Sequence, residues 1–293
     1  MTFDQTVLFW TALVPAVLAA GAVALGLTVK RIPNGTKTQL DVLVFSLGWW
    51  AAIAVSLYGR QGWPDAEWQL CLWPLTAWIV VTWLLSFNGC SSEAGRRTDT
   101  SWLACIVAAA SGLTAYICLP RGEVWEDTYD LHGPWGILLT LTMMLNAWSL
   151  SVMVRRHAER WVMLVALASL GGPVALAAAT YGSLTEWSVA MVSATIVFTF
   201  CGLVFPTSRV WEIAPIASAA GTCVIAAGRF QTFETYPSWL YGTMLFLPSG
   251  IAAVDFFVRR QATWKRVSIA GILAAAFVTT FIWFLLIRET ESW

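Results

Sequence analysis

Apolar runs of about twenty residues alternate with short polar segments along almost the whole chain of 293 residues. A helix rises about 1.5 Å per residue, so roughly 20 residues cross the hydrocarbon core of a bilayer. The pattern therefore predicts an all-α, polytopic transmembrane helical bundle, with residues 1–293 in a single integral membrane domain. We expect about ten spans, at residues 6–29, 41–58, 69–88, 102–119, 134–154, 161–180, 187–205, 211–228, 238–258 and 267–287.

The composition agrees with a membrane protein. Hydrophobic residues make up 58% of the chain and charged residues 12%, whereas a soluble domain carries about 25% charged residues. The formal net charge is zero, so the sequence predicts no basic surface for nucleic acid. The 19 tryptophans suit a chain that crosses the membrane–water interface many times. We expect the lipid bilayer to be the surroundings of most of the chain.

Basic residues fall mainly in every second connection between the predicted spans. Thirteen of the 17 are Lys30, Arg31, Lys37, Arg96, Arg97, Arg155, Arg156, Arg160, Arg209, Arg259, Arg260, Lys265 and Arg266. The other connections hold Arg60, Arg121, Arg229 and Arg288, together with most of the acidic residues. Basic connections of membrane proteins stay in the cytoplasm. The sequence thus predicts a bacterial-type plasma (inner) membrane protein with both termini outside the cytoplasm.

Ten spans divide into two halves of five, which would have opposite orientations, as in many secondary transporters. Pro15 in the first span corresponds to Pro173 in the sixth, and Pro74 in the third corresponds to Pro215 in the eighth. Pro248 in the ninth span has no counterpart in the fourth. The prolines leave two interpretations open: a five-plus-five inverted repeat, or unrelated kinks that neighbouring helices tolerate.

A small set of residues near the middle of the predicted spans interrupts regular apolar helix. Proline removes a backbone hydrogen bond and glycine weakens a helix, and a buried amide either bonds a neighbouring helix or contacts a polar solute. These residues are the candidates for a midplane polar site or a hinge: Asn146, Gly171, Gly172, Pro173, Pro15 and Pro248.

Asp255 and Arg259 lie about one helical turn apart near the cytoplasmic end of the ninth predicted span. The spacing is that of an ion pair within one helix, and a coupling site for a proton or cation is the alternative. No predicted span carries an ionisable residue at its midplane. This absence argues against a pump with a buried proton relay and against a voltage sensor.

The external segment 120–133 offers weak candidates for a metal site, namely Glu126, Asp130 and His132. Carboxylates and imidazole bind divalent metals, but the spacing matches neither an EF-hand nor an HExxH motif. A solvated acidic surface is the simpler interpretation, and we expect no metal. Nucleotide-binding and hydrolase motifs are also absent from the sequence, so no cofactor is predicted. Whether Cys71 and Cys118 form a disulfide stays open.

Three classes of function remain. A non-catalytic membrane subunit or scaffold, which binds other membrane subunits, is favoured because the predicted midplane lacks ionisable residues. A small-solute transporter or permease with a midplane site is the alternative, favoured by the interrupted helices. An integral membrane enzyme has the least support. A midplane cavity lined by Asn146, residues 171–173 and Pro248 would favour transport, whereas a packed midplane would favour the scaffold.

Overall fold

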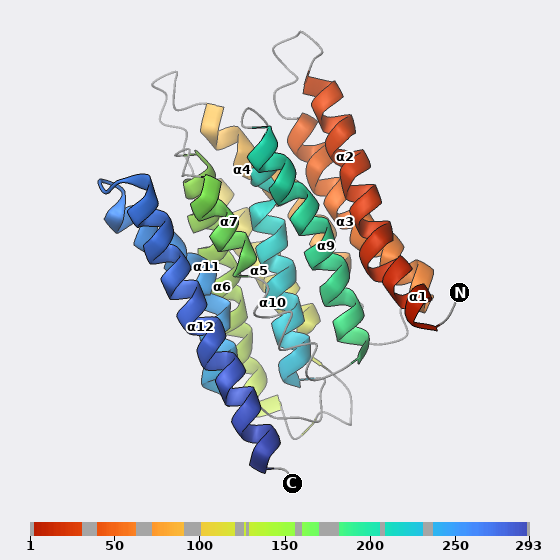
Figure 1. Ribbon diagram of the computed structural model, residues 1–293, viewed down its shortest axis with the longest axis vertical. Helices are drawn as coiled ribbons and strands as arrows, with labels where there is room; N and C mark the ends of the chain where they lie inside the picture. Colours follow the sequence, from red (N-terminus) through yellow and green to blue (C-terminus); the bar gives the residue numbers. More distant parts are fainter. Residues whose placement is uncertain are drawn as a thin grey trace.

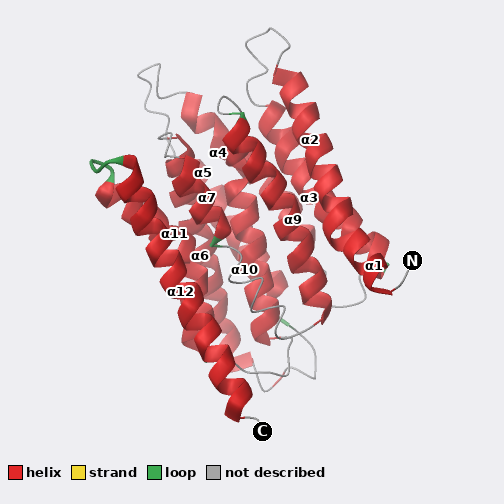
Figure 2. Cartoon of the chain, viewed as in Figure 1, coloured by secondary structure: helices red, strands yellow, loops and turns green. Residues whose placement is uncertain are grey.

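The chain is all-helical in the part that the structure describes. The computed structural model describes residues 3–30, 40–62, 72–90, 101–120, 126, 129–155, 160–169, 182–205, 209–230 and 237–291. Within these ranges the regular elements are helices, and no strand occurs (Figure 2). The predicted fold class, a helical bundle with apolar helices, is therefore confirmed at this level.

The helices follow one another as a series of antiparallel rods (Figure 1). Their bounds are α1 (Phe3–Leu8), the π-helix η1 (Phe9–Leu13), α2 (Val14–Lys30), α3 (Leu40–Gln61), α4 (Leu72–Cys90), α5 (Ser101–Cys118), α6 (Tyr129–Arg155), α7 (Arg160–Ala168), α9 (Gly182–Val204), the 3-10 helix η5 (Val210–Ile213), α10 (Ala214–Phe230), α11 (Ser238–Val258) and α12 (Thr263–Glu291). The chain begins at α1 and ends at α12 in the lower half of the view in Figure 1.

Six helical stretches in the described residues are long and apolar enough to cross a membrane. They are Gln5–Val29, Leu40–Arg60, Asp130–Val154, Leu184–Val204, Val210–Phe230 and Trp239–Val258. Two shorter apolar helices, Leu72–Ser86 and Trp102–Cys118, accompany them. These helices indicate a membrane location and a bilayer environment, but they do not confirm the count of ten spans. Most of the sixth predicted span, from residue 170 onward, lies outside the described residues.

Helix α10 forms the centre of the bundle. It packs against α4, α5, α6, α7, α9 and α11. From Ala214 to Phe230 the residues are buried, with Arg229 half-buried. Many of these residues are alanine, glycine, serine or threonine, and small side chains allow neighbouring helices to approach closely. The small side chains of α10 therefore explain its central position, because they allow neighbouring helices to pack closely around it.

Helices α2 and α3 pack closely through glycine. A Cβ atom added at Gly48 of α3 would overlap the methyl group of Ala22 on α2. One added at Gly26 of α2 would overlap the ring of Phe45 on α3. The absence of a side chain at these two positions lets the helices approach, which increases van der Waals contact between them. Pro15, farther toward the N-terminus of α2, is buried and follows the π-helix η1.

The packing does not confirm an inverted repeat. A two-fold relation between the predicted halves would pair α2 with α7, α3 with α9, α4 with α10 and α6 with α12. In the described part of the chain, α2 packs along α9 and α6 packs along α10. The corresponding contacts, α7 with α3 and α12 with α4, are not of comparable extent there, because α12 packs against α11 and α7 instead.

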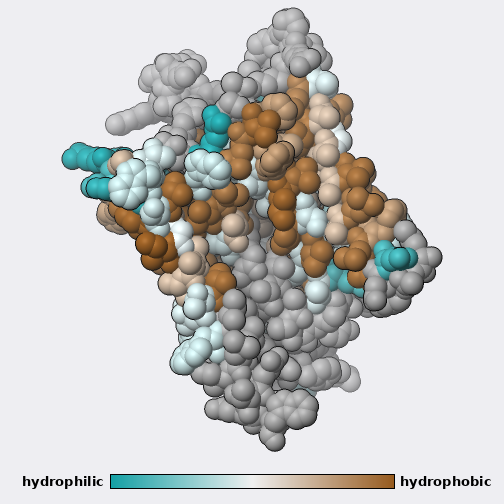
Figure 3. Space-filling view, viewed as in Figure 1, coloured by the Kyte–Doolittle hydropathy of each residue, from teal (hydrophilic) through white to brown (hydrophobic). Residues whose placement is uncertain are grey.

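The outer surface of the bundle is apolar. The face in Figure 3 shows apolar side chains along the helices and hydrophilic ones toward their ends. Large hydrophobic side chains such as Phe200, Ile196 and Ile272 are exposed. A contiguous apolar surface of this kind marks contact with a membrane or with partner proteins. Together with the six long apolar helices, it supports a lipid environment.

Candidate functional site

Asn146 of α6 is buried against α11. Its Nδ2 atom donates a hydrogen bond to the carbonyl oxygen of Leu245 at 2.9 Å, and its Oδ1 atom accepts one from the hydroxyl of Ser249. The side chain of Ser149, one turn farther along α6, lies 3.4 Å from the same hydroxyl. Only 1% of the Asn146 surface is exposed. Both ends of the amide are thus engaged by the neighbouring helix.

Pro248 explains why α11 needs these contacts. A proline within a helix lacks the N–H group that would bond the carbonyl four residues earlier, and its ring crowds that turn. Pro248 is buried inside α11, so the carbonyl of Met244, four residues earlier, lacks its usual backbone donor, and Leu245 is the next residue of that turn. Asn146 donates to a carbonyl in this turn. A neighbouring side chain therefore supplies hydrogen bonding where the proline weakens it, as membrane helices require.

Asp255 forms an ion pair between two helices. The Arg266 side chain of α12 places Nη2 at 2.5 Å and Nε at 2.9 Å from Asp255 Oδ1. The two side chains are 14% and 10% exposed, for Arg266 and Asp255 respectively. Arg259, which the one-turn spacing suggested as the partner, instead holds its guanidinium 4.8 Å from the centre of the Phe256 ring. The ion pair therefore joins α11 to α12 rather than bracing one turn of α11.

A groove of about 1010 Å³ runs between α6 and α11, and both Ser249 and the ion pair of Asp255 with Arg266 line it. Its walls include Trp148 and Val152 of α6 and Phe246 and Gly250 of α11. Ser149 and Ser249 also line it, while Asp255, Arg259, Arg260 and Arg266 line the end near the α11–α12 turn. The arrangement is a largely apolar groove that carries two serine hydroxyls and, at one end, positive charge.

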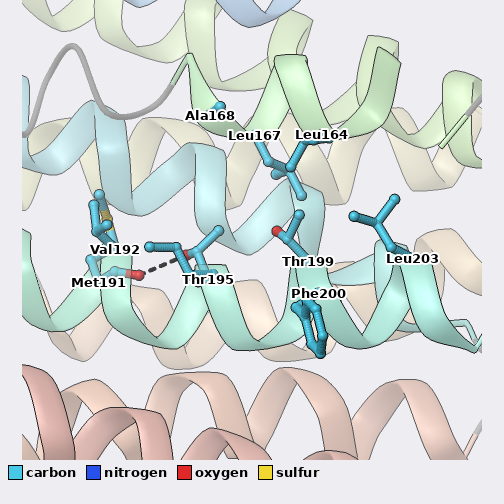
Figure 4. A pocket seen from close by; sticks show the side chains of 10 residues that line it. Leu164, Leu167, Ala168, Met191, Val192, Thr195, Thr199, Phe200 and Leu203 are labelled. Atoms are coloured by element: carbon cyan, nitrogen blue, oxygen red, sulfur yellow. Dashed lines mark hydrogen bonds between the residues drawn. The ribbon is translucent and has the colours of Figure 1, made fainter. Parts of the chain in front are cut away.

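A second cavity, of about 360 Å³, lies between α7 and α9. Leu164 and Leu167 of α7 face Thr195 and Thr199 of α9 across it (Figure 4). The hydroxyl of Thr195 is already bonded, because it donates to the carbonyl of Met191 at 2.7 Å. Among the described residues, the lining is apolar apart from Thr195 and Thr199 and carries no charged side chain. These residues form a cavity that can hold apolar groups.

A cluster of charges at the ends of three elements was not anticipated from the sequence. Arg209, just before η5, bonds Glu212 Oε1 at 2.6 Å through Nε. Its Nη1 lies 3.9 Å from the buried carboxylate of Asp41 at the start of α3, and its Nη2 donates to the carbonyl of Ser86 on α4 at 3.3 Å. Asp41 and Glu212 could be recognised in the sequence as acids at the starts of helices. Their shared contact with Arg209 could not, because Arg209 is 168 positions from Asp41 in the chain.

The weak metal candidates do not assemble. Glu126 and Asp130 are exposed, and His132 packs edge-on against Phe230 with ring centres 5.8 Å apart. In the ranges that the structure describes, no group of three or more His, Cys, Asp or Glu residues is arranged to hold a metal.

Three of the other candidates, Gly171, Gly172 and Pro173, lie outside the described residues. The same holds for Cys71, so its pairing with Cys118 stays open.

The comparisons with known proteins find no match to a family model, to a curated protein or to a solved structure. The function is therefore inferred from the geometry.

Proposed function

We propose that this chain is a non-catalytic membrane subunit or scaffold, whose outward-facing helices bind other membrane subunits. The observation that carries the proposal is the burial and hydrogen bonding of the Asn146 side chain. Its amide is 1% exposed and engages α11 through both its nitrogen and its oxygen. A residue that bound a solute would need a free polar group facing a cavity. Here the polar group is used to hold two helices together.

The packing of α10 supports the same function. The central helix is enclosed by six neighbours and is lined mainly by small buried side chains. In an alternating-access transporter, a substrate site lies near the midplane between moving bundles. Tight packing of the central helix leaves little room for such a site in the described residues. A rigid core with an apolar outer surface is instead what a subunit of a larger membrane assembly requires.

A small-solute transporter is the second candidate, because one observation favours it. The groove between α6 and α11 reaches the hydroxyls of Ser149 and Ser249, so polar groups lie along a path from one end of the bundle toward its middle. We regard this as the weaker proposal, since Asn146 and Ser249 bond each other. An integral membrane enzyme has no assembled group of acids or histidines to support it among the described residues.

Cysteine accessibility tests whether a water-filled path runs along the central helix α10, as a midplane transport site there would require. In a chain whose six native cysteines are replaced by alanine, single cysteines are introduced by Ser218→Cys and Thr222→Cys in α10. A membrane-impermeant methanethiosulfonate reagent is then applied from each side of sealed vesicles. For a scaffold we expect no labelling of either thiol, because both positions are buried. Ala262→Cys in the exposed α11–α12 turn is the positive control and should be labelled from one side.

Labelling after denaturation in detergent confirms that each buried thiol is present and reactive. A Ser218→Cys or Thr222→Cys protein that is labelled while folded would contradict the scaffold proposal. Such labelling would mean that water reaches the central helix, as a transport path requires.

The membrane and its topology belong to the same proposal. We infer a bacterial-type plasma membrane, with the basic ends of the helices in the cytoplasm and both termini outside. The support is the alternation of basic connections along the sequence. Arg160 begins α7, Arg209 directly precedes η5, and Arg259 and Arg260 directly follow α11, so this assignment puts all four on the cytoplasmic side.

A further inference from the structure

We propose that the groove between α6 and α11 is a binding site for an anionic phospholipid. Its headgroup phosphate lies at Arg259 and Arg260, and its acyl chains lie along the groove toward Ser249. This inference goes beyond the proposed function and does not depend on it, since scaffolds and transporters both bind lipids. Basic pockets between helices on the cytoplasmic side of membrane proteins bind anionic headgroups.

The charge at the mouth of the groove is the first argument. Of the charged residues that line it, Asp255 is neutralised by Arg266. Arg259 and Arg260 have no ion-pair partner in the described part of the chain, and both are exposed. The guanidinium of Arg259 lies over the Phe256 ring, with its central carbon 4.8 Å from the ring centre. Arginine presents its N–H donors in a fork that matches phosphate oxygens.

The length of the groove is the second argument. From Ser249 to Arg259 there are ten residues, or about 15 Å along the helix. This distance is about half of a hydrocarbon core of roughly 30 Å, and therefore the depth of one leaflet. An amphiphile with its headgroup at the arginines would thus end its acyl chains near Ser249. The groove volume of about 1010 Å³ lies at the upper end of the range for small-molecule sites.

The lining of the groove is the third argument. Trp148, Val152 and Phe246 provide apolar walls of the kind that an acyl chain contacts. The two serines do not call for a polar ligand, because the Ser249 hydroxyl is bonded to Asn146 and that of Ser149 to the carbonyl of Asn146. The lining therefore changes along the groove from uncharged residues around Ser249 to positively charged ones at Arg259 and Arg260. A phospholipid with a negative headgroup has the same polarity along its length.

A second copy of the chain fits this groove less well. Two copies related by a two-fold axis across the same face would contact each other with the same patch. In a membrane they would share one orientation, so Arg259 and Arg260 of both copies would lie at the same level. The like charges would then repel each other. A negatively charged lipid headgroup at this end would instead be attracted by both arginines.

Native mass spectrometry of the purified full-length protein tests the proposal. The protein is titrated in mixed micelles with phosphatidylglycerol or with phosphatidylcholine of identical acyl chains. We expect phosphatidylglycerol to bind more tightly than phosphatidylcholine. In Arg259→Gln/Arg260→Gln the affinity for phosphatidylglycerol should fall by roughly thirty-fold, as expected for two arginines near a headgroup. Arg160→Gln/Lys265→Gln is the matched control, because it removes the same charge without changing the lining of the groove.

A second variant tests the groove without changing any charge. Gly250 lines the groove, and a Cβ atom added there meets nothing within 4 Å. Gly250→Leu should therefore fold and fill the space, and should weaken phosphatidylglycerol binding by at least several-fold. Equal binding of both lipids, an equal loss in both double variants, or unchanged binding in Gly250→Leu would each overturn the proposal. Full competition by millimolar inorganic phosphate would also overturn it, because it would indicate a site for a free anion.

Discussion

The hydroxyl of Ser249 donates a hydrogen bond to the amide oxygen of Asn146, and the nitrogen of the same amide donates to the carbonyl of Leu245. Asn146 of α6 therefore contacts α11 at two residues, one before and one after Pro248. Because the proline weakens the backbone there, the contact fixes the shape of α11 as well as its distance from α6. This relation explains why an amide is placed among apolar residues.

Asn146→Leu should weaken the bundle by about 1 kcal/mol, the upper part of the range for hydrogen bonds between membrane helices. The variant removes the acceptor for the Ser249 hydroxyl and the donor for the loosened turn. The free energy of unfolding is measured by reversible denaturation in mixed detergent micelles. In a double-mutant cycle with Ser249→Ala, the two effects should not add. Strict additivity of the two changes would contradict a direct bond between these side chains.

Gly48→Ala should destabilise the protein, although alanine is the better helix former. The added methyl group would overlap that of Ala22, which is attached to the backbone of α2 and cannot turn away. Overpacking of this kind costs about 1–3 kcal/mol. The matched control is Gly21→Ala on α2, where an added Cβ meets nothing within 4 Å. The thermal midpoint of the purified protein should fall for Gly48→Ala and stay equal or rise for Gly21→Ala.

The helical elements were the easiest part of the structure to predict from the sequence. A continuous apolar run fixes a membrane helix by local hydrogen bonding alone, and every predicted span overlaps a described helix. Whether all of them cross the membrane depends on more than local pattern. The α4 and α5 helices are shorter apolar stretches, and residues 171–173 of the sixth predicted span lie outside the described residues. The count of ten spans and the inverted repeat thus remain predictions.

The candidate site was predicted only in part, for a physical reason. Asn146 and Pro248 were each visible as exceptions within an apolar run, but the partners of Asn146, Leu245 and Ser249, lie about 100 residues away in the chain. The ion-pair partner of Asp255 was not predicted, because the one-turn spacing that suggested Arg259 considers only neighbours within one helix. The turn at residues 259–262 brings α12 back beside α11, so Arg266 competes with Arg259 for the carboxylate. The groove depends on the packing of α6 against α11 and has no local sequence signal.

Asp255→Asn should loosen α12 from the bundle. It leaves the guanidinium of Arg266, which is 14% exposed, without its carboxylate. Breaking such a pair costs about 3 kcal/mol when the remaining charge is poorly solvated. Helix α12 packs mainly on α11 and α7, so this loss should appear as faster proteolysis at the exposed turn of residues 259–262. The rate for Asp255→Asn is compared with that for Arg259→Gln, which leaves the pair intact and should resemble the wild type.

The double variant Asp255→Asn/Arg266→Gln separates the pair from its surroundings. Removing both charges leaves no unpaired ion, so the double variant should resist protease better than Asp255→Asn alone. If the double variant were cut faster than the single variant, the cost would lie in lost packing and not in an unpaired arginine.

The orientation of the chain gives the last prediction. If the basic helix ends lie in the cytoplasm, the C-terminus beyond α12 is outside, because α12 begins beside Arg259 and Arg260 and ends at the opposite end of the bundle (Figure 1). Alkaline phosphatase fused after Trp293 should therefore be active, since it folds only outside the cytoplasm. The same enzyme fused after Gln261, in the α11–α12 turn, should be inactive and serves as the matched control. Activity at Gln261 with inactivity at Trp293 would reverse the orientation of the bundle. Equal activity at both sites would mean that α12 does not cross the membrane, because both of its ends would then lie on one side.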